Sequence, residues 1–162
     1  MKPAEEHRPA DYGPADYRPA DYGVLLLRLS LGVMFLAHGA VLKLATYGLP
    51  GTARFFASAG LPGWLAYPTA AAEAIGGLML VLGIQTRWVA LALSPVLLGA
   101  VLFVHGGKGW VFTAPGGGWE YPAYLFVLCV AQALLGDGAH ALGRSTLPRK
   151  PVVPTVAHAA AR

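Results

Sequence analysis

The chain has 162 residues, of which 56% are hydrophobic and only 12% charged, whereas soluble domains carry about 25% charged residues. With a mean hydropathy of +0.53, it is long enough for one domain but too poor in polar surface to be a soluble one, so we expect its excess apolar surface to face lipid. The formal net charge of +4 does not indicate nucleic acid as a partner, because the basic residues are scattered or lie in tails beside apolar runs.

The first segment, residues 9–22, contains the letters PADY three times. A proline at every fifth residue disfavours a continuous helix, and the near absence of aliphatic residues prevents the burial of a core. We therefore predict a disordered tail over residues 1–22. A second disordered tail, rich in proline and alanine, is predicted over residues 144–162, which leaves residues 23–143 as the membrane domain.

Four apolar runs lie between the tails, and each is compatible with a membrane-spanning helix, which needs about 20 mostly apolar residues. The expected helices cover about residues 24–44, 64–84, 88–105 and 119–136. A segment between the first two runs, bracketed by the letters YGLPG and GLPG, is expected to form a short helix in the membrane interface. The sequence therefore predicts an all-α fold, an integral membrane four-helix transmembrane bundle.

The single cysteine, Cys129, lies in the fourth run. It cannot form an intramolecular disulfide, and a buried cysteine usually behaves as a small hydrophobic residue. We therefore expect it to fill space inside a helix, and the lone thiol argues against self-contained thiol redox chemistry.

The distribution of lysine and arginine predicts the orientation in the membrane. Four spans place both termini on one side, which then holds most of the 12 basic residues. These are Lys2, Arg8, Arg18, Arg28, Arg87, Arg144, Arg149, Lys150 and Arg162, against Lys43, Arg54 and Lys108 on the other side. By the positive-inside rule both termini are predicted to be cytoplasmic, in a multi-pass membrane protein.

Glu73 is the most informative polar residue inside the runs. A carboxylate near the middle of a membrane costs several kcal/mol unless it is paired, protonated or hydrated. Small residues on its helix face, among them Ala70 and Gly77, allow another helix to approach closely. Glu73 is therefore expected to point into the bundle, either as a residue that locks helix packing or as a proton or ligand site.

His38 is predicted to lie in the same outer half of the bundle, at a depth comparable to that of Glu73. It could serve helix packing, or it could hydrogen-bond a quinone or relay a proton, because its pKa ordinarily lies near neutrality. The long side chains of Lys43 and Arg28 are expected to extend to the two membrane surfaces.

A glycine-rich loop follows the third run, and His105, Lys108 and Glu120 flank it, where they could form a lid over the site. The candidate site is thus a polar cluster of His38, Lys43, Glu73, His105 and Glu120. No metal is expected there, because no pair of these residues has a helical ligand spacing such as H-x-x-x-H.

The pattern resembles the DoxX family of small bacterial membrane proteins. The resemblance covers about residues 25–142, and its recognisable parts are the letters HGAVLKL in the first run, EAIGGL in the second and EY at the start of the fourth. It implies a four-helix membrane bundle, a place in the bacterial inner (plasma) membrane and a link to redox chemistry. Family members include a subunit of a thiosulfate:quinone oxidoreductase and a membrane partner of a complex that also holds a sulfurtransferase and a superoxide dismutase.

Three functions remain open from the sequence. The first is an accessory subunit of a quinone-linked oxidoreductase complex, with a quinone near His38, Glu73 and Glu120 and with soluble oxidoreductase subunits or a second copy of the chain as partners in the bilayer. Any enzyme activity would then belong to the complex. The second is a small proton-coupled transporter, and the third is a non-catalytic scaffold or assembly protein. No catalytic residue is identified from the sequence.

Overall fold

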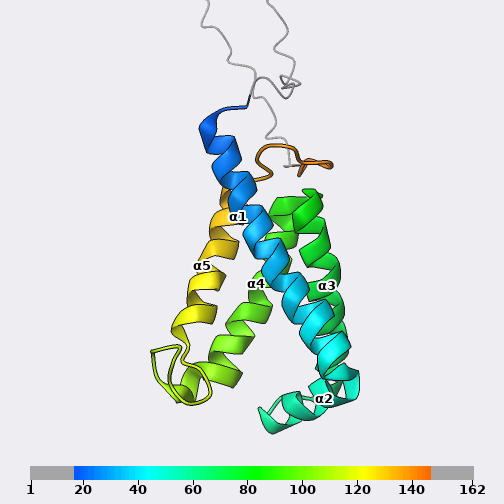
Figure 1. Cartoon of the computed structure of the whole chain (residues 1–162), viewed down its shortest axis with the longest axis vertical. Coiled ribbons are helices and arrows are strands. Elements are labelled where there is room, and N and C mark those ends of the chain that lie inside the picture. Colours follow the sequence, from blue (N-terminus) through cyan, green and yellow to red (C-terminus); the bar gives the residue numbers. More distant parts are fainter. Residues whose placement is uncertain (1–16, 147–162) are drawn as a thin grey trace, which may run out of the picture.

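The computed structural model describes residues 17–146, and in this part of the chain it contains α-helices and no β-strand beyond one isolated bridge (Figure 1). The all-helical prediction is confirmed for these residues. The five α-helices are α1 (Pro19–Leu36), α2 (Gly48–Ser58), α3 (Ala66–Leu82), α4 (Thr86–Gly99) and α5 (Glu120–Leu135).

Two of these helices continue as π-helices, which the sequence analysis did not predict. The π-helix η2 (Ala37–Thr46) extends α1, and the π-helix η4 (Ala100–His105) extends α4. Short 3₁₀ turns, η3 (Gly63–Leu65) and η5 (Gly106–Lys108), precede α3 and follow η4. The short α2 confirms a helix between the first two apolar runs.

Three continuous helices are long and apolar enough to cross a membrane: Pro19–Thr46, Gly63–Leu82 and Thr86–Lys108. Only 22–33% of the residues in their most apolar windows are buried inside the protein, so most of their apolar surface faces outward, as lipid contact requires. The fourth predicted span is shorter. With 16 residues, α5 is about 24 Å long, less than the ~30 Å of a bilayer core, and its crossing needs the residues that flank it.

The first helix begins earlier than expected. Pro19 occupies its first position, where the missing N–H of proline leaves no bond unmade, and the carboxylate of Asp21 accepts a hydrogen bond from the backbone N–H of Arg18 at 2.8 Å. The last PADY repeat is therefore helical rather than part of a tail. Most of both predicted tails, residues 1–16 and 147–162, lies outside the described residues.

The helices pack in two main pairs, α1 with α3 and α4 with α5. Glycines allow the first pair to approach closely, because a Cβ on Gly77 would lie 2.8 Å from the backbone nitrogen of Leu36 and a Cβ on Gly32 would lie 2.9 Å from the carbonyl of Gly77. The small-residue face predicted around Glu73 is confirmed.

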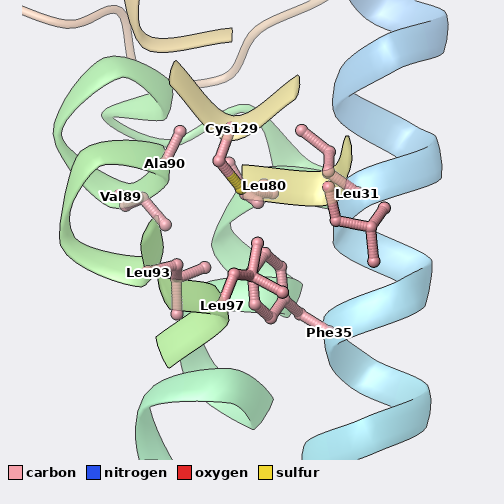
Figure 2. Close-up of a cluster of buried hydrophobic side chains, with 9 residues drawn as sticks. Leu31, Phe35, Leu80, Val89, Ala90, Leu93, Leu97 and Cys129 are labelled. Carbon is pink, nitrogen blue, oxygen red and sulfur yellow. The ribbon is translucent and has the colours of Figure 1, made fainter. Parts of the chain in front are cut away.

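A buried apolar core joins the two pairs (Figure 2). Phe35 of α1 is completely buried, and so is Cys129 of α5, which confirms the space-filling role expected for the thiol. The remaining members of this core are Leu31, Leu80, Val89, Ala90, Leu93, Leu97 and Leu125.

Arg28 contradicts the expectation that it extends to the membrane surface. Its side chain is buried, and its guanidinium donates to the backbone carbonyls of Asp137 at 2.8 Å and Ala139 at 3.3 Å. The chain after α5 folds back across the start of α1 to supply these carbonyls, as the bond from the Ala139 N–H to the Asp21 carbonyl shows. The start of α1 and the end of α5 therefore lie at the same end of the bundle (Figure 1).

Gly83, at the end of α3, makes room for Arg28 and generates a prediction. It adopts φ +70°, and a Cβ there would collide with the Arg28 guanidinium and lie 2.7 Å from the Ala141 Cα. Gly83→Ala should lower the free energy of unfolding by at least about 1–2 kcal/mol from the left-handed backbone alone. Gly99→Ala is the control, because it lies in a helix and a Cβ there meets nothing within 4 Å. Unfolding in mild detergent measures both, and equal stabilities would contradict the close packing of Arg28.

Candidate functional site

Four of the five predicted site residues line one cavity of about 820 Å³. His38 and Lys43 come from η2, Glu73 from α3 and His105 from the end of η4. Aromatic residues of α2, Phe55 and Phe56, also line it, and these were not predicted from the sequence. The glycine and proline pairs that bracket α2 signalled a helix there, but not that it closes a cavity.

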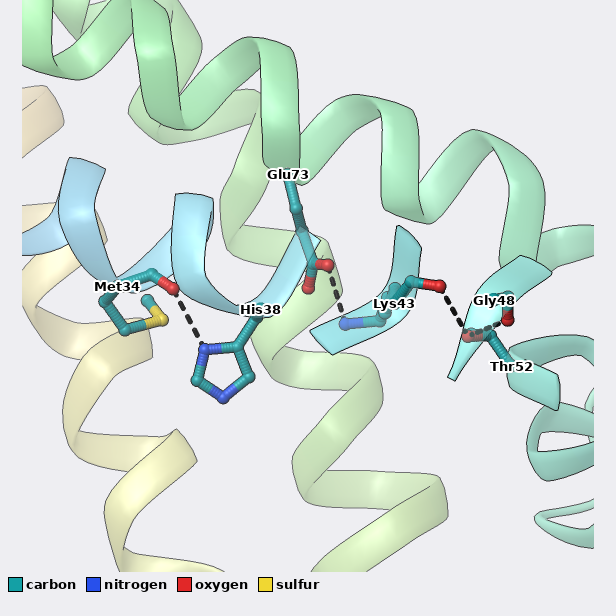
Figure 3. Close-up of polar contacts among 6 residues, drawn as sticks. All are labelled: Met34, His38, Lys43, Gly48, Thr52 and Glu73. Atoms are coloured by element: carbon teal, nitrogen blue, oxygen red, sulfur yellow. Dashed lines mark hydrogen bonds and ion pairs between the residues drawn. The ribbon is translucent and has the colours of Figure 1, made fainter. Parts of the chain in front are cut away.

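Glu73 and Lys43 form an ion pair at the cavity wall, with 2.6 Å between the Lys43 Nζ and the Glu73 Oε2 (Figure 3). The carboxylate side chain is only 5% exposed and the lysine side chain 18%. Glu73 thus points into the bundle as predicted. Of the two expectations for Lys43, extension to the membrane surface is wrong, because its ammonium turns inward to the carboxylate and lies with the polar cluster. The pairing satisfies a carboxylate that apolar surroundings would otherwise destabilise.

The π-helix explains how Lys43 and His38 reach the same cavity. They are five residues apart, a spacing that separates two side chains on an α-helix, whose turn is 3.6 residues. In a π-helix the backbone bonds run from residue i to i+5, so residues five apart lie nearly above one another. The π-helical winding therefore directs both side chains to the cavity. The 3.6-residue periodicity of an α-helix, on which the sequence prediction rests, does not reveal this.

Gly39 allows the π-helix η2, which contains Lys43, to pack directly against α3. A Cβ at Gly39 would lie 2.6 Å from the backbone nitrogen of Ala74 and 2.7 Å from the Cβ of Glu73. Thr52 of α2 also contacts the π-helix, because its hydroxyl proton is shared between the carbonyl of Gly48 at 3.0 Å and that of Lys43 at 3.3 Å. The position of the lysine is thus fixed by two neighbouring helices.

Both histidines use Nδ1 to bond a backbone carbonyl. The His38 Nδ1 lies 2.9 Å from the Met34 carbonyl oxygen on the preceding turn (Figure 3). The His105 Nδ1 lies 2.8 Å from the carbonyl oxygen of Gly117 in the glycine-rich loop. His38 therefore shares the cavity with Glu73, as its depth predicted, but the ion-pair partner of Glu73 is Lys43.

Glu120 stands apart from the other four residues. It does not line the large cavity, and its Oε1 accepts a hydrogen bond from the backbone N–H of Phe112 at 2.9 Å. Lys108, which does line the cavity, donates to the carbonyl of Gly116 at 3.2 Å. Glu120 thus stabilises the loop between η5 and α5 by a hydrogen bond. Glycines of that loop line the cavity.

Pro95 lies inside α4 without ending the helix. Proline has no N–H for the carbonyl of Leu91 one turn earlier, and the Ser94 hydroxyl donates to that carbonyl instead, at 2.8 Å. The helix therefore continues past the proline to His105.

Within residues 17–146, no group of three or more His, Cys, Asp and Glu side chains could hold a metal ion.

Comparison with known proteins finds one family and one curated relative. A family model described as DoxX matches residues 23–106, a range that contains all four cavity residues and ends before Glu120. The chain is 41% identical over 116 residues to a Bacillus subtilis (strain 168) protein described as "Putative oxidoreductase CatD", with 71% of this chain and 80% of the relative covered. No solved structure matches.

The ion pair generates a prediction for a double-mutant cycle. Lys43→Met leaves a buried carboxylate unpaired and Glu73→Gln leaves an unpaired ammonium, so each should lower the free energy of unfolding by about 3–5 kcal/mol. The double variant should lose much less than the sum, because neither charge remains. Unfolding in detergent measures the cycle.

Lys108→Met is the matched control for this cycle, because the exposed Lys108 makes no ion pair among the described residues. Its effect should be within about 0.5 kcal/mol and should add to that of Glu73→Gln. Additive losses for Lys43 and Glu73 would contradict the pairing.

Proposed function

The chain belongs to the DoxX family of membrane proteins, and from that premise we propose that it is the membrane subunit of a quinone-linked oxidoreductase complex in the plasma membrane of a bacterium. The observation that carries the proposal is the cavity between the helices, with polar side chains gathered in a mostly apolar wall. The description of the Bacillus subtilis relative as an oxidoreductase supports the assignment to redox chemistry.

The cavity fits a ligand of the quinone class. Its volume of about 820 Å³ falls within the roughly 300–1,000 Å³ of small-molecule sites, which are largely apolar with a few placed polar groups. Phe55 and Phe56 supply apolar wall for a ring. Lys43, His38 and His105 supply polar atoms for its two oxygen substituents. His105 takes the place that the sequence analysis gave to Glu120.

A bound quinone would supply a two-electron acceptor within the membrane. The residues of this chain orient the ring and can relay protons to it. Each reduction takes up two electrons, which we assign to a soluble oxidoreductase partner, and two protons, which we assign to water and to relay through the two histidines on the cavity wall.

Gly99 offers a way to test the proposal by filling the cavity. It lines the cavity, and a side chain built there enters open space. The wild-type protein and Gly99→Ala, purified in mild detergent from bacterial membranes, should carry quinone detectable by extraction and mass spectrometry. Gly99→Phe should carry at least about tenfold less, because its ring occupies the ligand's volume.

Other outcomes of this experiment favour the other two functions. Absence of quinone together with pH-dependent uptake into vesicles would favour a proton-coupled transporter. Absence of both would favour a scaffold, whose polar residues only fix helix packing. Quinone retained equally by Gly99→Phe would place the ligand outside the cavity.

We also propose that α5 crosses the membrane and that both chain ends are cytoplasmic. The support is that the start of α1 and the chain after α5 bond to one another, together with the excess of basic residues on that side. In a Cys129→Ala background, Thr113→Cys in the opposite loop should react with an impermeant maleimide in intact cells. Thr146→Cys should react only after permeabilisation. The reverse labelling pattern would overturn this orientation.

A further inference from the structure

The two cavity histidines share an arrangement that fixes where their protons lie. In each ring Nδ1 bonds a backbone carbonyl, that of Met34 for His38 and that of Gly117 for His105. A carbonyl oxygen can only accept a hydrogen bond, so Nδ1 must donate in both rings. In a neutral imidazole the other nitrogen, Nε2, then carries no proton and acts as an acceptor.

Neither ring has a second partner in the described part of the chain. Neither histidine forms an ion pair within residues 17–146, and the one carboxylate on the described cavity wall, Glu73, is engaged by Lys43. No hydrogen bond from the described part of the chain reaches either Nε2. In its neutral form each histidine therefore leaves one unpaired hydrogen-bond acceptor, at Nε2.

We propose that the cavity selects the reduced, hydroquinone form of its ligand over the quinone form, with the Nε2 atoms of His38 and His105 accepting hydrogen bonds from the ligand hydroxyls. This inference rests on the proposed function and names the redox state that the site prefers. A hydroquinone presents two O–H donors. A quinone presents only acceptor oxygens, and these would leave both Nε2 lone pairs unsatisfied. The Lys43 ammonium can donate to an oxygen of either form, so the histidines account for the discrimination.

The preference has a consequence for electron transfer. Binding the reduced form more tightly raises the reduction potential of the bound couple above that of the free couple, by about 30 mV for each tenfold difference in affinity in a two-electron reaction. The bound quinone thereby becomes the stronger acceptor for the two electrons and two protons of each reduction. The site is thus suited to quinone reduction by a partner.

Direct binding tests the selectivity in the purified full-length protein. Equilibrium dialysis in detergent under anaerobic conditions, with a decyl-tailed benzoquinone and the matching hydroquinone, gives both dissociation constants. We expect the hydroquinone to bind about a hundredfold more tightly, about tenfold for each of the two unpaired Nε2 atoms, which is the lower end of the usual cost of an unpaired polar group. The bound couple, titrated potentiometrically, should shift upward by the corresponding amount.

Asparagine variants isolate the Nε2 atoms. The side-chain amide of Asn in His38→Asn or His105→Asn can still donate to the neighbouring carbonyl, but it places no acceptor at the Nε2 position. Each variant should weaken hydroquinone binding by about tenfold while changing benzoquinone binding less than about twofold. His140→Asn is the matched control, since His140 packs against Tyr17 and Tyr22 away from the cavity, and it should leave the ratio unchanged.

The outcomes separate this inference from the function on which it rests. Equal affinities, or tighter binding of the benzoquinone, would overturn the inference and leave quinone binding intact. Failure of the wild-type protein to bind either form would overturn both. The ratio of the two dissociation constants in the wild-type protein tests the inference even if an asparagine variant does not fold.

Discussion

A carboxylate that lies among apolar helices must find a partner, and the pair of Glu73 and Lys43 meets that requirement at 2.6 Å. Two features of the surrounding helices bring these side chains together. The π-helix turns Lys43 toward α3, and Gly39 removes the side chain that would hold the two elements apart. Each feature alone would be unfavourable, because a π-helix is rare and a glycine weakens a helix. Together they place a charged pair between two helices instead of in lipid.

The two ends of the bundle are built differently. At the end where the described chain begins and finishes, Arg28 and the segment after α5 tie α1, α3 and α5 together above the apolar core. At the other end the helix pairs enclose a cavity that α2 and the glycine-rich loop help to line. A closed end gives rigidity to the helices that carry the site. The open volume at the other end gives a ligand room, which is why function is assigned there.

The cavity gathers residues that are far apart in the sequence, and the way each is held determines its chemistry. Lys43 is paired with the carboxylate of Glu73. The two histidines are bound to carbonyls, which orients their rings and fixes their tautomers. In the proposed function, one ammonium donor beside two Nε2 acceptors forms a site for a small aromatic ligand with oxygen substituents at the ring. A DoxX-family protein of this kind would take part in redox chemistry without supplying the electron donor itself.

The sequence by itself determined the helices, the membrane class, the family and the burial of Glu73, because run length, glycine and proline positions and the cost of a buried carboxylate are local properties. The tertiary structure decided where the long side chains go. Arg28 and Lys43 were expected at the membrane surfaces, yet both turn inward, because carbonyls after α5 and the carboxylate of α3 are brought within reach only by packing. Glu120 was expected in the site, but its carboxylate accepts a hydrogen bond from the backbone N–H of Phe112 in the loop before α5. The position of that N–H depends on how the loop folds, so the sequence does not reveal this partner. A flexible charged side chain takes its direction from its neighbours, and the sequence does not specify which neighbours those are.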